Sequence, residues 1–124
     1  MEIKTPKKIF IVDDDEMLTM ALSDFLSRDT KHDISTFPTG EECSKHLGEN
    51  PDIIILDYYL NTVQKDAANG LEVLNAMRKV VPHTRFIMLS SQESYTKAAQ
   101  TIQKGAEQYV IKDEAAFQKI ADMI

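Results

Sequence analysis

The sequence is poor in the residues that mark disulfide-rich and membrane-spanning proteins. Its 124 residues contain one cysteine, Cys43, and no tryptophan. A single cysteine cannot form an internal disulfide, and its presence fits a reducing compartment. No apolar run approaches the roughly 20 residues that a membrane-spanning helix needs, and the N-terminus lacks the apolar core of a signal peptide. These absences favour a cytoplasmic protein without membrane contacts.

Positive charge is also in deficit. The chain has 14 lysines and arginines against 20 acids, which gives a net charge of -6. A surface that binds nucleic acid would need a basic face, so we expect no direct contact with nucleic acid. The length suits one domain that buries most of its apolar surface. We expect a single domain over residues 1–124, in which the polar residues 1–7 are flexible.

Short apolar runs alternate with longer segments of helical periodicity along the whole chain. The runs predict buried strands and the periodic segments predict helices. The predicted strands are residues 8–12, 33–37, 53–56, 85–89 and 108–111, and the predicted helices are residues 15–28, 40–48, 70–80, 93–104 and 114–123. Five strand–helix units in succession predict an α/β fold with one doubly wound parallel sheet, because right-handed crossovers place helices on both faces.

The spacing of apolar residues predicts which side of two helices faces the core. In residues 70–80, the inward positions are Leu71, Leu74, Met77 and Val80. In residues 93–104, the apolar side is thin and consists of Tyr95, Ala98, Ala99 and Ile102. We therefore expect this second helix to be only marginally buried.

Four of the predicted strands end in charged or hydroxylic residues. Asp13 and Asp14 follow the first strand, and Asp57, Ser90 and Lys112 follow the third, fourth and fifth. Ligands bind at the carboxyl ends of the strands in an open parallel sheet, so these side chains should converge on one rim. Three acids, a hydroxyl and an ammonium can together hold a divalent cation and a phosphoryl group.

Each of these residues alone has a simpler explanation. Asp57 and Ser90 are also common turn residues, and a lysine at a strand end is usually solvated. The acids after the first strand can cap the following helix, and we expect Asp15 to do so. The prediction of a site depends on the combination.

The combination resembles the receiver domain of two-component response regulators. The resemblance covers essentially the whole chain, and the pieces that carry it are Ile11–Glu16, Asp52–Asp57, Ile87–Ser91 and Gly105–Lys112. The last piece resembles the family's Gly-Ala-x-x-Tyr-x-x-Lys signature. The resemblance implies a flavodoxin-like (βα)5 fold with the strand order 2-1-3-4-5, which agrees with the predicted elements.

The resemblance also implies roles for individual residues. Asp57 is the expected phosphoacceptor, which forms an acyl phosphate. Lys112 is expected to neutralise charge on a phosphoryl oxygen, and the Ser90 hydroxyl to donate to another. Tyr109 resembles the family's switch aromatic, which moves inward when Ser90 is drawn toward the phosphoryl group. A tyrosine in a strand is otherwise usually half-buried packing.

A magnesium ion is the cofactor that the resemblance implies. The implied ligands are Asp14, Asp57 and the backbone carbonyl of Tyr59, with Asp13 bound mainly through water. Mg²⁺ prefers carboxylate and phosphate oxygens together with retained waters, which suits this set. Without a cation, three close acids would repel one another and raise one another's pKa.

The sequence departs from the family pattern at several positions. Asp113 follows Lys112 where the family often has a proline with a cis bond, which puts the aim of the lysine in question. The loop Asn61–Asn69 is longer than usual, and its role is open. Tyr59 and Gln92 occupy the two positions that, in the family, tune loss of the phosphoryl group to water. The resemblance implies that the bulky ring of Tyr59 can shield the acyl phosphate.

The favoured function is a signalling switch that a histidine kinase or a phosphotransfer protein phosphorylates on Asp57. The phosphoryl group would alter the surface of the fourth helix, fifth strand and fifth helix, with a phosphorylation-dependent homodimer as one outcome. Such a domain is not an enzyme, although it can take phosphate from small donors and lose it slowly. One alternative is a Mg²⁺-dependent phosphohydrolase that uses Asp13 and Asp15, and another is a phosphorylation-independent adaptor. A stand-alone regulator and a piece of a longer protein both fit the sequence.

Overall fold

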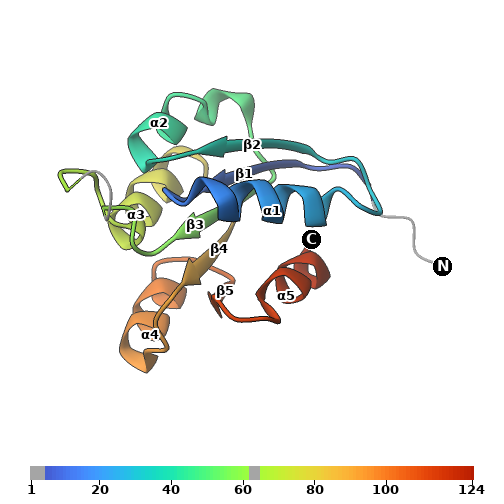
Figure 1. Cartoon of the computed structure of the whole chain (residues 1–124). Coiled ribbons are helices and arrows are strands. Elements are labelled where there is room, and N and C mark those ends of the chain that lie inside the picture. The colour runs from blue at the N-terminus through green and yellow to red at the C-terminus, as the bar shows by residue number, and fades with distance from the viewer. Residues whose placement is uncertain (1–4, 62–64) are drawn as a thin grey trace.

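The five predicted strands form one parallel sheet in the predicted order, β2-β1-β3-β4-β5 (Figure 1). A computed structural model describes residues 5–61 and 65–124. The strands are β1 (Lys8–Val12), β2 (Asp33–Phe37), β3 (Ile53–Asp57), β4 (Arg85–Ser90) and β5 (Gln108–Ile111). The flavodoxin-like (βα)5 fold is therefore confirmed.

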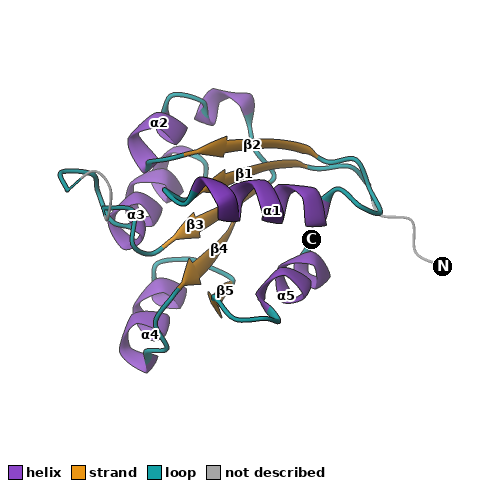
Figure 2. Ribbon diagram, viewed as in Figure 1, coloured by secondary structure: helices purple, strands orange, loops and turns teal. Residues whose placement is uncertain are grey.

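Helices cover both faces of the sheet (Figure 2). The α-helices are α1 (Glu16–Leu26), α2 (Gly40–Ser44), α3 (Gly70–Val80), α4 (Tyr95–Gln103) and α5 (Ala116–Met123). Helices α1 and α5 pack on one face, and α2 and α3 contribute to the core of the other. In the described part of the chain, no helix is long and apolar enough to cross a membrane.

The alternation of side chains along β1 divides the core into two halves. Phe10 and Val12 belong to the half under α2 and α3, and Ile9 and Ile11 belong to the half under α1 and α5. Every residue of β3 is buried because this strand is central and covered on both sides. The two packed halves fix the position and direction of the strand that ends in Asp57.

The predicted helix over residues 40–48 is wrong in its second half. Helix α2 ends at Ser44, and a 3-10 turn, η1 (Leu47–Glu49), follows it. The backbone bonds in this stretch span three residues, as in the bond from the His46 N–H to the Cys43 carbonyl (2.9 Å). The tighter winding still buries Cys43 and Leu47 in one core, so the apolar spacing alone did not reveal the break.

The predicted inward side of α3 is wrong at Val80. Its side chain is 65% exposed, whereas Val73 and the helix-terminating Val81 are buried. The helix rotates by about 100° per residue, and Leu74, Met77 and Val81 follow the buried side more closely than Val80 does. Val81, the residue directly after α3, therefore packs into the core in place of Val80.

The predicted apolar side of α4 is also wrong in part. Tyr95 is 89% exposed and Ile102 is 45% exposed, whereas Thr101 is fully buried. The Thr101 hydroxyl donates to the carbonyl groups of Lys97 and Ala98, so a polar residue is buried without an unsatisfied group. A search for apolar periodicity misses such a residue.

The N-terminal segment and the loop after β3 were both predicted to be irregular. Residues 1–4 and 62–64 lie outside the described residues. The predicted flexibility of residues 1–7 and the role of the loop Asn61–Asn69 therefore stay predictions there. Residues 5–7 have no regular structure, although the Lys7 N–H donates to His32 Nδ1 (3.0 Å). At the far end of the loop, the Ala68 N–H donates to Glu41, which fastens the loop to α2.

Gly70 allows α3 to begin directly against the backbone that follows Asp57. A Cβ atom on Gly70 would lie 2.3 Å from the Asp57 carbonyl oxygen. The Gly70 N–H donates to the Tyr58 carbonyl (2.8 Å), and Asn69 caps the helix in a capping box with Glu72. The chain therefore has no room for a side chain at this position.

Gly70→Ala should lower the free energy of unfolding by about 1–3 kcal/mol, because the backbone at Asp57 cannot move aside as a flexible side chain would. Gly48→Ala is the matched control, since a Cβ there meets nothing within 4 Å. Urea denaturation of both variants measures the difference. An equal effect in the two variants would contradict the close approach at Gly70.

Candidate functional site

The strand register brings the predicted site residues to one edge of the sheet. Val12 pairs with Leu56, so the next residues, Asp13 and Asp57, emerge side by side. Ser90 pairs with Ile111, which places the following residue, Lys112, beside the same edge. The arrows of β2, β3 and β4 point toward this edge in Figure 1.

A single ammonium lies against two buried carboxylates. Lys112 Nζ is 3.0 Å from Asp13 Oδ2 and 3.2 Å from Asp57 Oδ1. Both acids are 3% exposed. The peptide bond to Asp113 is trans, so the lysine reaches Asp57 without the cis bond that the family often has. The sequence had predicted the approach to Asp57 but not the closer contact with Asp13.

Burial and charge perturb the ionisation of this cluster. Burial, reinforced by the negative charge of Asp13, raises the pKa of Asp57 to about 7, while Lys112 opposes the shift. Burial alone would lower the pKa of Lys112, but the charges of Asp57 and Asp13 outweigh it and raise that pKa. The lysine therefore stays charged, and Asp57 ionises at a cost that a second cation would relieve.

The cluster fits a divalent cation. Asp13, Asp14 and Asp57 each offer a carboxylate oxygen, and these oxygens lie within 4.8 Å of one another. The buried Asp13 Oδ2 accepts no hydrogen bond from the described residues, although it pairs with the Lys112 ammonium. Carboxylate oxygens with spare lone pairs are the donors that Mg²⁺ prefers. The Tyr59 carbonyl stays a predicted ligand, and the Tyr59 N–H donates to Asp57 Oδ1 (3.3 Å).

Asp15 has a different task, as expected. Its side chain caps α1 by accepting a hydrogen bond from the Leu18 N–H (3.2 Å), and its own N–H donates to Asp13 Oδ1 (2.9 Å). The backbone of Asp15 therefore helps to position Asp13. The Asp15 carboxylate is exposed and belongs to the helix end, which disfavours the hydrolase that would use it as an acid.

Ser90 and Tyr109 are linked through the backbone of one residue. The Gln92 N–H donates to the buried Ser90 Oγ (3.2 Å), and the Tyr109 hydroxyl donates to the Gln92 carbonyl (2.7 Å). A displacement of Ser90 would therefore disturb the hydrogen bond of Tyr109. This connection could not be read from the sequence, because it depends on the path of the chain after β4.

Sequence reasoning missed Lys97 and the ring of Tyr58. The Lys97 ammonium lies 5.4 Å from the centre of the Tyr58 ring and 4.9 Å from that of Tyr59, and it donates to both Tyr59 and Gln92. Lys97 lies in a predicted helix with no motif around it, so its sequence context carried no signal. Only the orientation of α4 in the structure shows that the Lys97 side chain lies against Tyr58, Tyr59 and Gln92.

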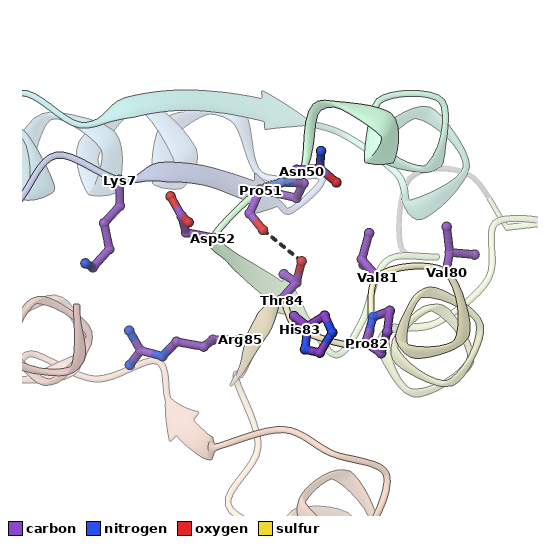
Figure 3. A pocket seen from close by; sticks show the side chains of 10 residues that line it. All are labelled: Lys7, Asn50, Pro51, Asp52, Val80, Val81, Pro82, His83, Thr84 and Arg85. Carbon is purple, nitrogen blue, oxygen red and sulfur yellow. Dashed lines mark hydrogen bonds between the residues drawn. The ribbon is translucent and has the colours of Figure 1, made fainter.

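A hollow of about 580 Å³ lies at the opposite edge of the sheet (Figure 3). Three of its polar side chains are engaged in the fold. Thr84 donates to the Pro51 carbonyl (2.7 Å), and the guanidinium of Arg85 binds Glu107 and the Met123 carbonyl. Asp52 accepts the Lys8 N–H (2.8 Å). We therefore assign the candidate site to the acid cluster, where the charged groups converge.

Comparison with known proteins identifies the family. The family model of the response regulator receiver domain matches residues 9–124. This chain belongs to that family. Among curated relatives, the response regulator protein VraR of Staphylococcus aureus is 28% identical over 121 residues, which cover 94% of this chain and 54% of VraR. The transcriptional activator DevR/DosR of Mycobacterium tuberculosis is 30% identical over 108 residues, which cover 86% of this chain and 48% of the relative.

Solved receiver domains share the fold. The beryllofluoride-activated receiver domain of DrrB, a protein of Thermotoga maritima, superimposes with a TM-score of 0.81 at 24% identity, over 96% of this chain and 95% of that one. At this identity the likeness shows the fold alone. This receiver chain spans about half the length of the curated relatives it matches.

In buffer without divalent cations, Asp57→Asn should stabilise the protein at pH 8 by about 1–3 kcal/mol, because it removes a costly buried charge. The folded carboxyl keeps its proton up to about pH 7, whereas an ordinary aspartate loses it near 3.8. The folded state thus binds more protons between these values, and the contribution of Asp57 to stability falls as the pH rises through this window.

The gain should therefore shrink as the pH falls from about 7 toward 3.8, and it should vanish below 3.8, where both states are protonated. Urea denaturation at several pH values measures it, with the exposed Asp29→Asn as the control. A destabilised Asp57→Asn variant at pH 8 would contradict the account.

Proposed function

We propose that this receiver domain accepts a phosphoryl group on Asp57 from a sensor histidine kinase or a phosphotransfer protein. The observation that carries the proposal is the contact of one buried ammonium, that of Lys112, with the buried Asp57 and Asp13. The proposed domain comprises residues 1–124 and acts in the cytoplasm. Its partners are proteins of the phosphorelay, and it makes no direct contact with nucleic acid.

In the proposed transfer, an oxygen of Asp57 forms a bond to phosphorus as the bond between phosphorus and a donor histidine nitrogen breaks. The products are an aspartyl phosphate and a neutral imidazole, which takes up a proton if it leaves as an anion. The Lys112 ammonium would move from the Asp57 carboxylate to a phosphoryl oxygen, where the negative charge then lies. The Ser90 hydroxyl would donate a hydrogen bond to another phosphoryl oxygen.

Asp14, Asp57 and the Tyr59 carbonyl would hold Mg²⁺, with Asp13 bound through water. When bound, the ion supplies positive charge for the phosphoryl oxygens. Asp13 and Asp14 thus serve chiefly to hold a cation next to the nucleophile. The proposed chemistry is a stoichiometric transfer with slow loss to water, which distinguishes the domain from an enzyme.

The proposed output is a change in the surface of α4, β5 and α5. Ser90 would leave the Gln92 N–H to reach the phosphoryl group, and Tyr109 would then lose its place on the Gln92 carbonyl. The highly exposed Tyr95 and the half-exposed Ile102 lie on the same surface, which a phosphorylation-dependent homodimer could bury. A phosphorylation-independent adaptor would not need this linkage.

Acetyl phosphate with Mg²⁺ should label the protein with one phosphoryl group, and Asp57→Asn should abolish the label because it removes the proposed acceptor. Asp13, the other acid against Lys112, would be occupied in holding Mg²⁺ through water. Intact-protein mass spectrometry measures it. Asp15→Asn is the control and should still take the label. Sustained release of phosphate that depends on Asp15 would instead support the hydrolase.

Mg²⁺ should raise the melting temperature, since the ion relieves repulsion among the three acids. Asp14→Ala should lose most of that gain, whereas the exposed Asp29→Ala should keep it. Differential scanning calorimetry with and without Mg²⁺ tests this expectation. An undiminished gain in Asp14→Ala would place the ion elsewhere.

A further inference from the structure

Lys97 forms a closed triangle of hydrogen bonds with two residues of the site loops. Its ammonium donates to the Tyr59 hydroxyl and to Gln92 Oε1 (2.9 Å), and the Tyr59 hydroxyl donates to the same Gln92 oxygen (2.7 Å). Tyr59 comes from the loop after β3, Gln92 from the loop after β4, and Lys97 from the first turn of α4. The triangle therefore joins three separate segments at the carboxyl edge of the sheet.

Both loop residues of the triangle also contact the chemical groups of the site. The Tyr59 N–H donates to Asp57, and the Gln92 N–H donates to Ser90 Oγ. The carbonyl of Gln92 accepts the Tyr109 hydroxyl. One ammonium on α4 is thus a single step from residues that touch the phosphoacceptor, the hydroxyl beside it and the switch tyrosine.

The local structure keeps the ammonium in this position. Ser94 caps α4 by accepting a hydrogen bond from the backbone N–H of Lys97 (3.2 Å), which fixes where the side chain starts. The Tyr58 and Tyr59 rings lie within cation–π distance of the charge. The hydrogen bond to Tyr59 raises the pKa of Lys97 and keeps it a cation.

We propose that Lys97 is a positioning residue that locks Tyr59 and Gln92 together beside Asp57 and thereby prolongs the life of the aspartyl phosphate. This inference rests on the proposed function. Loss of the phosphoryl group requires water to attack phosphorus as the bond to the Asp57 oxygen breaks, which yields the carboxylate and dihydrogen phosphate. With the two loops held together, the Tyr59 ring and the Gln92 amide restrict the approach of that water.

The test compares the decay of the phosphoryl label after acetyl phosphate is removed. Lys97→Met keeps the length of the side chain but not its charge, and the label should decay roughly three- to tenfold faster, as expected for the loss of partly exposed charge-assisted hydrogen bonds. Lys97→Arg should restore most of the lifetime. Lys104→Met removes an exposed lysine from the end of the same helix and should decay like the wild type.

A double-variant cycle shows whether Lys97 acts through Tyr59. Tyr59→Phe keeps the ring but removes the hydroxyl, so Lys97→Met combined with Tyr59→Phe should decay little faster than the faster single variant. A wild-type lifetime in Lys97→Met would overturn the inference. Additive effects of Lys97→Met and Tyr59→Phe on the decay rate would also overturn it. So would a lower melting temperature of Lys97→Met that by itself accounts for the faster decay.

Amide chemical shifts of the unphosphorylated protein provide a readout that needs no phosphoryl group. Lys97→Met should move the signals of Tyr59, Ser90, Gln92 and Tyr109, whereas Lys104→Met should not. If the wild type takes no label at all, the proposed function fails, and these shifts decide whether Lys97 positions the loops. Unchanged shifts in Lys97→Met would refute the positioning role itself.

Discussion

Two buried carboxylates that share one ammonium are the constraint on which the rest of this structure depends. Asp13 and Asp57 are almost completely buried, and Lys112 reaches both. Two carboxylates face one ammonium, which leaves an excess of negative charge. The folded chain tolerates this excess because the two packed halves of the core hold the strand ends in place. Such an arrangement is costly for a domain that only needs to be stable. It is suited to a site in which a cation and a phosphoryl group arrive and change the balance.

The same constraint explains how chemistry at Asp57 can be felt at a distance. The groups around it are not isolated: the backbone of Gln92 links Ser90 to Tyr109, and Lys97 links Gln92 to Tyr59. These hydrogen bonds cross from the site to α4 and β5. A shift of Ser90 toward a new charge would therefore disturb bonds that hold the exposed surface of α4, which gives a physical route from phosphorylation to output.

Much of the fold and the core of the site could be predicted because their signals are local. Apolar runs located four of the five strands, and the residues that follow these runs are the acids, Ser90 and Lys112. The failures have physical causes. The 3-10 turn after Ser44 buries the same positions that a continued helix would bury. Thr101 can be buried because its hydroxyl donates to a carbonyl group within α4. Lys97 was missed because its contacts depend on how α4 is rotated against two loops, which no motif records.

A phosphoryl group on Asp57 should alter the surface of α4 and β5 through the hydrogen bonds that link Ser90, Gln92 and Tyr109. The most direct measurement compares the amide chemical shifts of the wild-type protein with and without Mg²⁺ and beryllofluoride, which stands in for the phosphoryl group on Asp57. We expect changes that extend through residues 90–112, including Gln92, Lys97 and Tyr109. Changes confined to the immediate neighbours of Asp57 would contradict it, even if the ligand binds.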